Sequence, residues 1–191
     1  MDLQLPGGAL IAAWPGLPDP NFAQTVLLMC DHSEQGAFGL VLNRLLELKV
    51  SDLLPDHPVL GRLSTAVYLG GPVDHQRLQF VHMLPGRIQG GREVCTGLWI
   101  GGDLDQLAEV LAESEDGVGS EPPVKLFLGY AGWSEGQLES ELAEGTWMPA
   151  PFDSNVIFSG QGERTWEAVV ESVDPERSGE PDSTLGDASD N

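Results

Sequence analysis

Residues 25–44 read TVLLMCD-HSEQG-AFGLVLNR, two apolar runs joined by a short polar link. The first run, 25–31, is apolar almost throughout, which indicates a strand that is buried on both faces of a sheet. The second run, 37–43, contains Gly39, which permits another backbone to approach closely. The link between them has the length and the glycine of a hairpin loop. We therefore expect the two runs to be neighbouring antiparallel strands.

Outside this hairpin, shorter apolar runs predict further strands at residues 8–14, 67–69, 78–84, 94–100 and 124–130. Helical periodicity and capping residues predict helical segments at 50–54, from Asp103 to about Leu111, from Ser134 to about Gly145, and at 163–173. Strands outnumber helices, and their order along the chain is irregular. The sequence therefore indicates an α/β fold of the α+β-like kind with an irregular mixed sheet.

The chain is expected to form a single domain over residues 1–173, followed by an acidic disordered tail over 174–191 that is rich in Pro, Ser, Gly and Asp. No apolar run approaches the ~20 residues that span a bilayer. Residues 1–8 contain Asp2 but no Lys or Arg, unlike the basic start of a signal peptide. We therefore expect a cytoplasmic protein without a membrane partner.

Net charge is the most pronounced feature of the composition. With 30 acidic and 9 basic residues, the chain carries −21. Residues 174–191 hold six acids and one arginine and so account for −5, which leaves −16 on residues 1–173. Binding to nucleic acid depends on Lys and Arg that neutralise the phosphate backbone. We therefore expect no direct binding to nucleic acid, while solubility alone is a sufficient reason for the acidity.

The charge is unevenly distributed along the chain. Residues 40–93 contain six bases and five acids, so this part is nearly neutral, and it repels an anionic ligand or an acidic protein partner least. Asn43 and Arg44 end the second strand of the hairpin, which places the Arg44 guanidinium at a sheet edge. Its planar fork suits a carboxylate or a phosphate. The alternative is an ion pair with a neighbouring acid that fixes a loop.

The sequence contains no complete catalytic set. Asp31 to Glu34 supply the residue types of a hydrolytic triad, but adjacent side chains of a strand point to opposite faces. Gly129 to Trp133 resemble a nucleophile elbow only in outline, because Ala131 occupies the position of the nucleophile. The glycine pairs at 70–71 and 90–91 lack the frame and the lysine of a phosphate-binding loop. We predict no catalytic residue and no cofactor.

The histidines and cysteines show no metal-binding or redox spacing. The histidines are His32, His57, His75 and His82. They lack the close pairs that place two imidazoles on one helical face, so no metal is predicted, although a site that includes Asp31 or Asp74 stays open. Cys30 and Cys95 form no Cys-x-x-Cys pair and are expected to be reduced core residues. The sequence leaves a disulfide between them open.

Several short blocks become specific when they are taken together. In order, they are Asp19-Pro20-Asn21-Phe22, His32, Gly36-Ala37, Gly39 to Arg44, Gly70-Gly71-Pro72-Val73, Gly129 to Trp133, and Gln137-Leu138-Glu139. These blocks resemble the YqgE/AlgH family of bacterial proteins and cover the chain from about Gly8 to Val173. The chain departs from the family pattern at Leu45, where proline usually follows Asn-Arg, so a looser turn is expected there.

The resemblance implies an irregular α/β fold with a bifurcated sheet and a small barrel-like portion, flanked by helices. The family has no agreed activity and no agreed catalytic residues. Some members carry the label of transcriptional regulator, without an established DNA-binding motif. Within the blocks, Trp133 suits a position that covers the sheet, and Tyr130 suits the presentation of its hydroxyl to a cleft.

Two functions follow as hypotheses. The favoured one is a non-enzymatic binding or regulatory module that acts through contacts with a protein partner, because no catalytic set is intact. The alternative is a small-molecule or enzymatic site near His32, Asn43, Arg44 and the Gly70-Gly71-Pro72 turn. The candidate surface as a whole comprises His32, Asn43, Arg44, Gly70, Gly71, Pro72, Tyr130 and Trp133.

Overall fold

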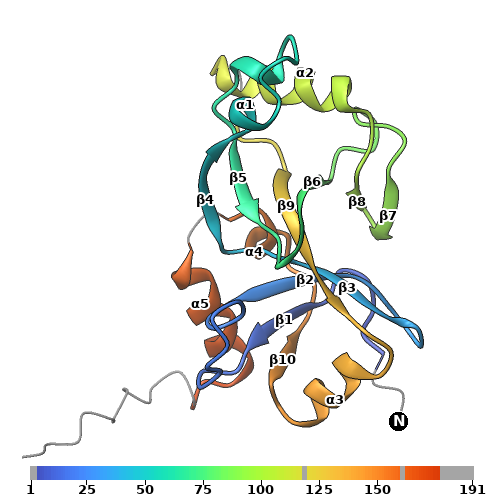
Figure 1. The fold of residues 1–191 in the computed structure, drawn as a ribbon, viewed down its shortest axis with the longest axis vertical. Coiled ribbons are helices and arrows are strands. Elements are labelled where there is room, and N and C mark those ends of the chain that lie inside the picture. The colour runs from blue at the N-terminus through green and yellow to red at the C-terminus, as the bar shows by residue number, and fades with distance from the viewer. Residues whose placement is uncertain (1–3, 118–119, 160–161, 177–191) are drawn as a thin grey trace, which may run out of the picture.

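The computed structural model describes residues 4–117, 120–159 and 162–176. These residues form ten strands in one branched sheet, with helices on its faces (Figure 1). The α/β class and the irregular mixed sheet predicted from the sequence are confirmed. The disordered tail expected over 174–191 lies almost entirely outside the described residues. No helix in the described part of the chain is long and apolar enough to cross a membrane.

One half of the sheet is built around the predicted hairpin. Its strands are β1 (Leu10–Ala13), β2 (Val26–Ser33), β3 (Gly36–Val41) and β10 (Trp147–Ala150). β2 and β3 are antiparallel, with Leu28 opposite Leu40, as expected. Leu28 and its neighbour Leu27 belong to different hydrophobic clusters, so β2 is buried on both faces. This double burial explains the continuous apolar run in the sequence.

The other half of the sheet consists of β4 (Leu45–Lys49), β5 (Ala66–Leu69), β6 (Val73–His82), β7 (Arg92–Cys95) and β8 (Leu98–Ile100). β9 (Val124–Trp133) belongs to both halves. Its end pairs with β3, whereas its start runs parallel to β5 and antiparallel to β6. The sheet branches at β9, and among the described residues it is not closed into a barrel, so the barrel-like portion is not confirmed.

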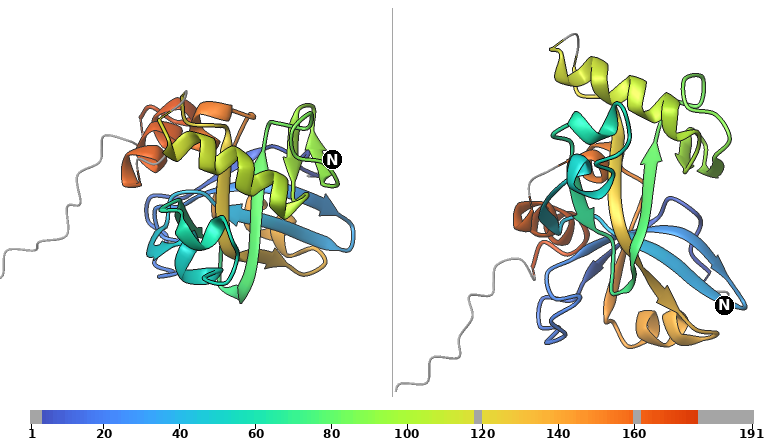
Figure 2. Two further views of the ribbon diagram at one scale, coloured as in Figure 1. Left: turned by 90° about the horizontal axis from the view of Figure 1, so that it is seen from above. Right: turned by 45° about the horizontal axis from the view of Figure 1, so that its top comes forward.

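The helical segments are α1 (Val50–Leu53), the 3-10 turn η1 (Leu60–Arg62), α2 (Leu104–Glu115), α3 (Gln137–Ala143), α4 (Ser154–Phe158) and α5 (Glu163–Val173). Trp166 and Val169 of α5 pack against one face of the hairpin half, and Leu138 of α3 packs against the other. α1 and α2 cover the second half of the sheet (Figures 1 and 2). One cluster spans both halves, because Val81 of β6 and Leu98 of β8 pack in the same cluster as Leu28 of β2, whereas the clusters under α3 and under α2 each belong to one half.

Most predicted elements are present, and the differences have local causes. The strand predicted at 94–100 is two strands, because Gly97 at φ +86 turns the chain between β7 and β8. The helix predicted to open at Ser134 begins at Gln137, whose side chain accepts a hydrogen bond from the Ser134 N–H. The sequence pattern does not indicate β4, η1, β10 or α4, each of which has five residues or fewer.

Candidate functional site

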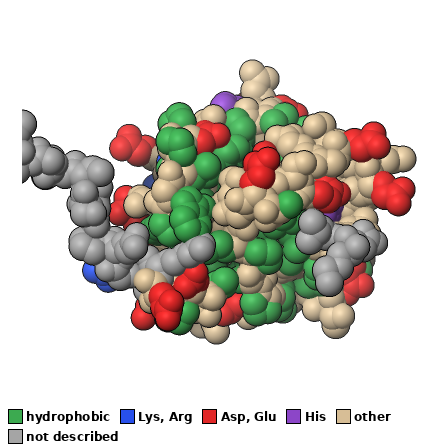
Figure 3. All heavy atoms as spheres, turned by 90° about the horizontal axis from the view of Figure 1, so that it is seen from below, with side chains coloured by type: hydrophobic (Ala, Val, Ile, Leu, Met, Phe, Trp, Pro, Cys, Tyr) green, Lys and Arg blue, Asp and Glu red, His purple; other side chains and the backbone are tan. Residues whose placement is uncertain are grey.

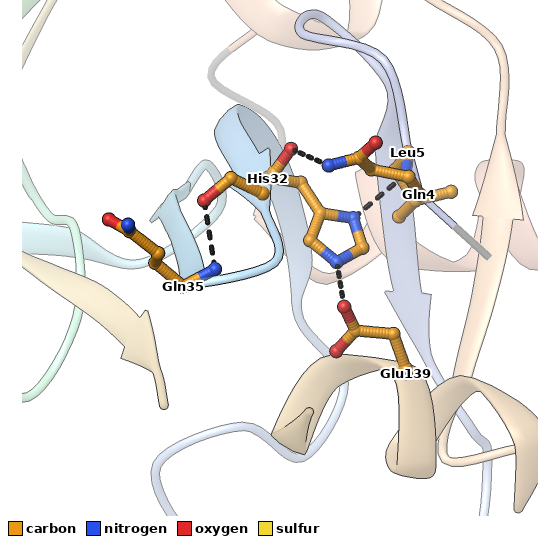
Figure 4. Close-up of polar contacts among 6 residues, drawn as sticks. Gln4, Leu5, His32, Gln35 and Glu139 are labelled. Carbon is orange, nitrogen blue, oxygen red and sulfur yellow. Dashed lines mark hydrogen bonds and ion pairs between the residues drawn. The ribbon is translucent and has the colours of Figure 1, made fainter. Parts of the chain in front are cut away.

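His32, near the end of β2, is a buried link between three segments of the chain (Figure 4). Its Nδ1 accepts a hydrogen bond of 2.8 Å from the Leu5 N–H, and its Nε2 lies 2.9 Å from Oε1 of Glu139 on α3. Gln4 Nε2 donates to the His32 carbonyl oxygen at 2.9 Å. Because Nδ1 is an acceptor, the proton of the neutral imidazole lies on Nε2. Both ring nitrogens are therefore occupied by protein groups.

Glu139 is the partner that orients this imidazole. Hydrogen bonds from its own backbone N–H and from His32 lower the pKa of the Glu139 carboxyl, so the carboxylate persists as an acceptor. A hollow outside His32 is lined by Gln4, Asp31 and Arg92, among other residues. The geometry makes His32 a link that holds the N-terminal segment and α3 against β2.

Asn43, just beyond β3, is also buried, and both polar atoms of its side chain form hydrogen bonds within the protein. Its Oδ1 accepts from the Val26 N–H at 2.9 Å, and its Nδ2 donates to the carbonyl oxygens of Gln24 at 2.9 Å and Gly162 at 3.3 Å. Val26 begins β2, and His32 lies six residues farther along the same strand. At ~3.3 Å per residue, this separates Asn43 from His32 by about 20 Å. The two residues do not share one site.

The Gly70-Gly71-Pro72 turn crosses β9 with no room for side chains. A Cβ atom on Gly70 would lie 2.3 Å from the Gly129 carbonyl oxygen, and one on Gly71 would lie 2.2 Å from the Tyr130 carbonyl carbon. Gly129 itself adopts φ +72, and its Cβ would lie 2.6 Å from the Gly71 oxygen. These glycines permit the close crossing that brings Pro72 to the end of β3.

Arg44 borders a hollow that joins three of the sequence blocks. The hollow has a volume of about 90 Å³, and its lining consists of Pro20, Asn21, Val41, Arg44, Leu69, Gly71, Pro72 and His75. We call it the Arg44 hollow. The block at 19–22, the end of the hairpin and the glycine turn meet there. Of the predicted site residues it contains Arg44, Gly71 and Pro72, and it excludes His32, Asn43, Gly70, Tyr130 and Trp133.

Within the described residues, the guanidinium of Arg44 is bound to a backbone carbonyl and to no acid. Its Nη2 donates to the Ala23 carbonyl oxygen at 2.7 Å, and the Arg44 carbonyl oxygen accepts from the Leu69 N–H at 2.7 Å. None of the ion pairs within the described residues includes Arg44. The described residues therefore do not contain the alternative, an ion pair between Arg44 and a neighbouring acid that fixes a loop. Arg44 fixes the loop through a carbonyl, and its charge has no carboxylate partner in the described chain.

Unusual backbone conformations flank the Arg44 hollow on both sides. Gln24 adopts φ +55 and Asp74 adopts φ +50, and they are the two non-glycine residues with positive φ in the part of the chain that the structure describes. Gln24 follows Ala23, which binds Arg44, and Asp74 lies between Pro72 and His75. Left-handed backbone costs a non-glycine residue about 1 kcal/mol, and such residues cluster at functional sites. Their placement favours this hollow as the functional surface.

Two exposed apolar residues follow lining residues of the hollow in the sequence. Leu45, which follows Arg44, is 60% exposed, and Val73, which follows Pro72, is 39% exposed. Leu45 is the residue that stands where proline was expected, and it begins β4. Exposed apolar side chains next to a hollow are typical of a surface that another molecule covers.

Tyr130 and Trp133, the remaining predicted residues, pack within the fold. The Tyr130 ring lies 4.9 Å from the Phe38 ring, centroid to centroid, and its hydroxyl has no hydrogen bond within the described residues. Trp133 is buried, and its indole N–H donates to Oε2 of Glu141 at 2.8 Å. Trp147 donates to the same oxygen at 2.7 Å. Trp133 thus covers the sheet beside α3.

Sequence reasoning missed Asn21 and His75 as members of the hollow. Asn21 belongs to a block that carried the resemblance, and His75 was considered only as a metal ligand, so neither pointed to Arg44. Within residues 4–117, 120–159 and 162–176, no group of three or more His, Cys, Asp or Glu side chains is arranged to hold a metal ion. Cys30 and Cys95 are free; Cys30 is buried, and burial raises the pKa of its thiol to about 12.

Comparison with known proteins places the chain in a family. A family model described as AlgH-like matches residues 10–178. A UPF0301 protein of Chlorobium luteolum is 38% identical over 169 residues, which cover 88% of this chain and 86% of that protein. A UPF0301 protein of Chlorobaculum tepidum is 40% identical over 165 residues, with coverage of 86% and 85%.

Solved structures agree with this result. The solution structure of the AlgH protein from Pseudomonas aeruginosa is 33% identical, has a TM-score of 0.67, and covers 97% of this chain and 95% of its own. The crystal structure of a protein from Corynebacterium diphtheriae has a TM-score of 0.68 over 88% of this chain and 87% of its own; at 24% identity it supports the fold alone. The resemblance seen in the motifs is confirmed, and the chain belongs to the AlgH-like family of UPF0301 proteins.

Proposed function

We propose that this chain is a non-enzymatic binding module that docks an acidic segment of a protein partner at the Arg44 hollow. The observation that carries the proposal is the Arg44 guanidinium, which has one hydrogen bond to a carbonyl and no ion pair within the described chain. Carboxylates are abundant in a chain with 30 acidic residues. An arginine that is fixed in place without one of them is available to a carboxylate from outside.

The size of the hollow favours a side chain over a free metabolite. Its volume of about 90 Å³ is well below the ~300 Å³ at which pockets for small molecules begin. One Asp or Glu side chain of a partner needs far less room than a metabolite with a ring. The hollow therefore suits a single anchoring side chain, and the remaining contact area has to come from the surface around it.

The surroundings of the hollow supply that area. Leu45 and Val73, which follow the lining residues Arg44 and Pro72 in the chain, are exposed, and burial of such a side chain contributes roughly 1–2 kcal/mol. Arg77 is exposed on β6 two residues beyond His75 along the chain. Basic and apolar side chains are therefore both exposed in the nearly neutral part of the chain.

Charge elsewhere on the molecule favours one orientation of the partner. One face, seen from below, has many Asp and Glu side chains and little Lys or Arg surface (Figure 3). An acidic segment is repelled by such a face and steered toward the nearly neutral residues 40–93. The same charge opposes direct contact with DNA, so we infer that any regulatory role is exerted through a protein.

The alternative, a small-molecule or enzymatic site that combines His32, Asn43 and Arg44, has less support. His32 and Asn43 are about 20 Å apart by strand geometry, and the polar atoms of both side chains are bonded to protein groups. No observation at Arg44 points to a reaction.

Affinity capture from native lysate tests the proposal. The wild-type chain is compared with Arg44→Ala, with the double variant Arg44→Ala/Arg77→Ala, and with Arg92→Ala as control. Arg92 is an exposed arginine that lines the hollow beside His32. We expect a partner with an acidic segment that is retained by wild type and Arg92→Ala, weakened by Arg44→Ala and absent with the double variant. Unchanged capture by the double variant contradicts the proposal.

A further inference from the structure

Lys125 on β9 is a buried lysine that has no carboxylate partner among the residues that the structure describes. Its residue is 5% exposed, and its Nζ donates to the carbonyl oxygens of Ile157 at 3.0 Å and Ser159 at 2.8 Å. The Nζ also lies 4.0 Å from the centroid of the Tyr68 ring. None of the ion pairs within the described residues includes it. Lysine is almost never this deeply buried unless an acid pairs with it.

Burial changes the protonation of this amine. Removal from water disfavours the ammonium form and lowers the pKa of Lys125 to about 7. A lysine in water stays protonated near neutral pH and has almost no nucleophilic amine. Lys125, in contrast, has a large neutral fraction at pH 7.5. The amine donates to two carbonyl oxygens, and the face of the Tyr68 ring lies 4.0 Å from Nζ.

Lys125 also lines a pocket of useful size. The pocket has a volume of about 380 Å³, within the range that holds small molecules. Its other walls come from different parts of the fold and include Thr65, Tyr68, Leu111, Ser114, Glu121 and Phe158. It shares no lining residue with the Arg44 hollow. A neutral amine in a partly apolar pocket is the arrangement that enzymes use to activate a lysine.

We propose that Lys125 is a reactive amine that forms a reversible imine with a small uncharged aldehyde or ketone in this pocket. The lone pair of the neutral amine attacks the carbonyl carbon, and the electrons of the C=O π bond move to oxygen. One proton moves from nitrogen to that oxygen, and the carbinolamine so formed then loses its hydroxyl and the remaining proton on nitrogen as water. One C=N bond replaces one C=O bond, and no oxidant or reductant is consumed.

The surroundings of Nζ select this class of ligand. The imine formed from the neutral amine carries no charge, so it does not meet the desolvation that lowers the pKa of Lys125. A carbamate formed with carbon dioxide would instead place an anion near the two carbonyl oxygens. Glu115 and Glu121 line the same pocket and repel ligands that carry a carboxylate or phosphate. An uncharged carbonyl compound meets neither obstacle.

The chain provides an internal control for the test, because its two lysines are Lys49 and Lys125. Lys49 is exposed on β4 and serves as an ordinary lysine. The full chain is incubated at pH 7.5 with propanal and cyanoborohydride, which reduces an imine to a stable amine, and peptide mass spectrometry gives the rate at each lysine. We expect Lys125 to be alkylated ~10-fold faster than Lys49 or more, because the neutral fraction of its amine is far larger.

Two further arms make the result specific. Lys125→Arg, which keeps a cation and donors for the two carbonyls, should lose the label at this position and keep that at Lys49. Glyoxylate, an anionic aldehyde, should react at Lys125 more slowly than propanal when both rates are divided by those at Lys49. Alkylation of Lys125 no faster than that of Lys49 overturns the proposal and leaves Lys125 as a link to α4. Equal preference for propanal and glyoxylate overturns the assignment of an uncharged ligand.

Discussion

The Nη2 atom of Arg44 donates a hydrogen bond of 2.7 Å to the carbonyl oxygen of Ala23. The loop that carries Ala23 is closed by Asp19, whose carbonyl oxygen accepts from the Ala23 N–H at 2.7 Å and whose Oδ1 accepts from the Asn21 N–H at 2.8 Å. The same few residues therefore shape the loop, fix the guanidinium and form one wall of the Arg44 hollow. Stability and binding at Arg44 can be separated by substitution.

Arg44→Lys tests the role of the planar fork. Lysine keeps the positive charge but cannot bind a carboxylate through two parallel N–H groups. Loss of the bond to Ala23 should lower the free energy of unfolding by about 1 kcal/mol, measured by urea titration. Retention of the protein partner should fall far more than this small change explains. The same substitution at Arg92 is the control, and equal retention by both variants argues against Arg44.

Gly129→Ala tests the crossing of the glycine turn and β9. Gly129 has φ +72 and would place a Cβ 2.6 Å from the Gly71 oxygen, whereas Gly145 has φ +77 and no atom within 4 Å of its Cβ. Gly145→Ala should therefore lower the free energy of unfolding by about 1 kcal/mol, the cost of left-handed backbone alone. Gly129→Ala should cost roughly 3 kcal/mol or more, because backbone must also move. Equal losses in urea titrations would show that the crossing has room to relax.

Glu141→Ala tests the carboxylate that Trp133 and Trp147 share. Both indole N–H groups donate to its Oε2, at 2.8 and 2.7 Å, and the substitution leaves both donors without an acceptor. The free energy of unfolding should fall by roughly 2–4 kcal/mol, and tryptophan fluorescence should shift as well. Glu144→Ala, at an exposed position after the same helix, should change stability by less than about 0.5 kcal/mol. If Glu141→Ala lowers the free energy of unfolding as little as Glu144→Ala does, the two indole hydrogen bonds to Glu141 do not stabilise the fold as predicted.

Lys125 predicts a pH dependence of stability with a definite sign. Its pKa in the folded chain is about 7, below the ordinary lysine value, so the unfolded chain binds more protons at this site above pH 7. The free energy of unfolding should therefore rise with pH, by up to about 1.4 kcal/mol per unit. Urea titrations at pH 7, 8 and 9 should show this rise in wild type and a flatter profile in Lys125→Met. Parallel profiles would mean that Lys125 titrates normally.

The acidity of the chain predicts the outcome of DNA-binding assays. With −16 on residues 1–173, the chain offers no basic surface extensive enough to replace counterions along a duplex. A gel shift with purified protein at about 0.15 M salt should show no complex. A complex whose affinity falls steeply with salt would instead establish direct binding to DNA.

Much of the fold could be predicted because its signals are local. The run at 25–31 is apolar on both faces because both faces of β2 are covered, and α5 begins and ends where its apolar stripe does. β4 could not be predicted, because Leu45 and Leu48 are exposed on it and its pairing with β5 is irregular. Burial of alternate residues, the usual signature of a strand, is missing there.

The candidate site was predicted only in part. Arg44 and the glycine turn were identified from charge and conformation, but His32 and Asn43 were grouped with them, although both are internal links. All of them belong to the blocks that carry the resemblance, but β2 keeps His32 far from Asn43. Asn21 and His75 lie beside Arg44 because the loop at 19–22 and the chain after the glycine turn meet there. This proximity depends on tertiary structure, so no local sequence pattern indicates it.

Photo-crosslinking at Leu45 tests the docking surface most directly. A photoreactive amino acid replaces Leu45, which is 60% exposed beside Arg44, or, as control, Leu104, which is 37% exposed at the start of α2. After irradiation in native lysate, we expect a discrete adduct with one protein at Leu45 and none at Leu104. The adduct should disappear with Arg44→Gln and persist with Arg92→Gln. An adduct at Leu45 that survives Arg44→Gln unchanged, or no adduct at Leu45 at all, would contradict docking at the Arg44 hollow.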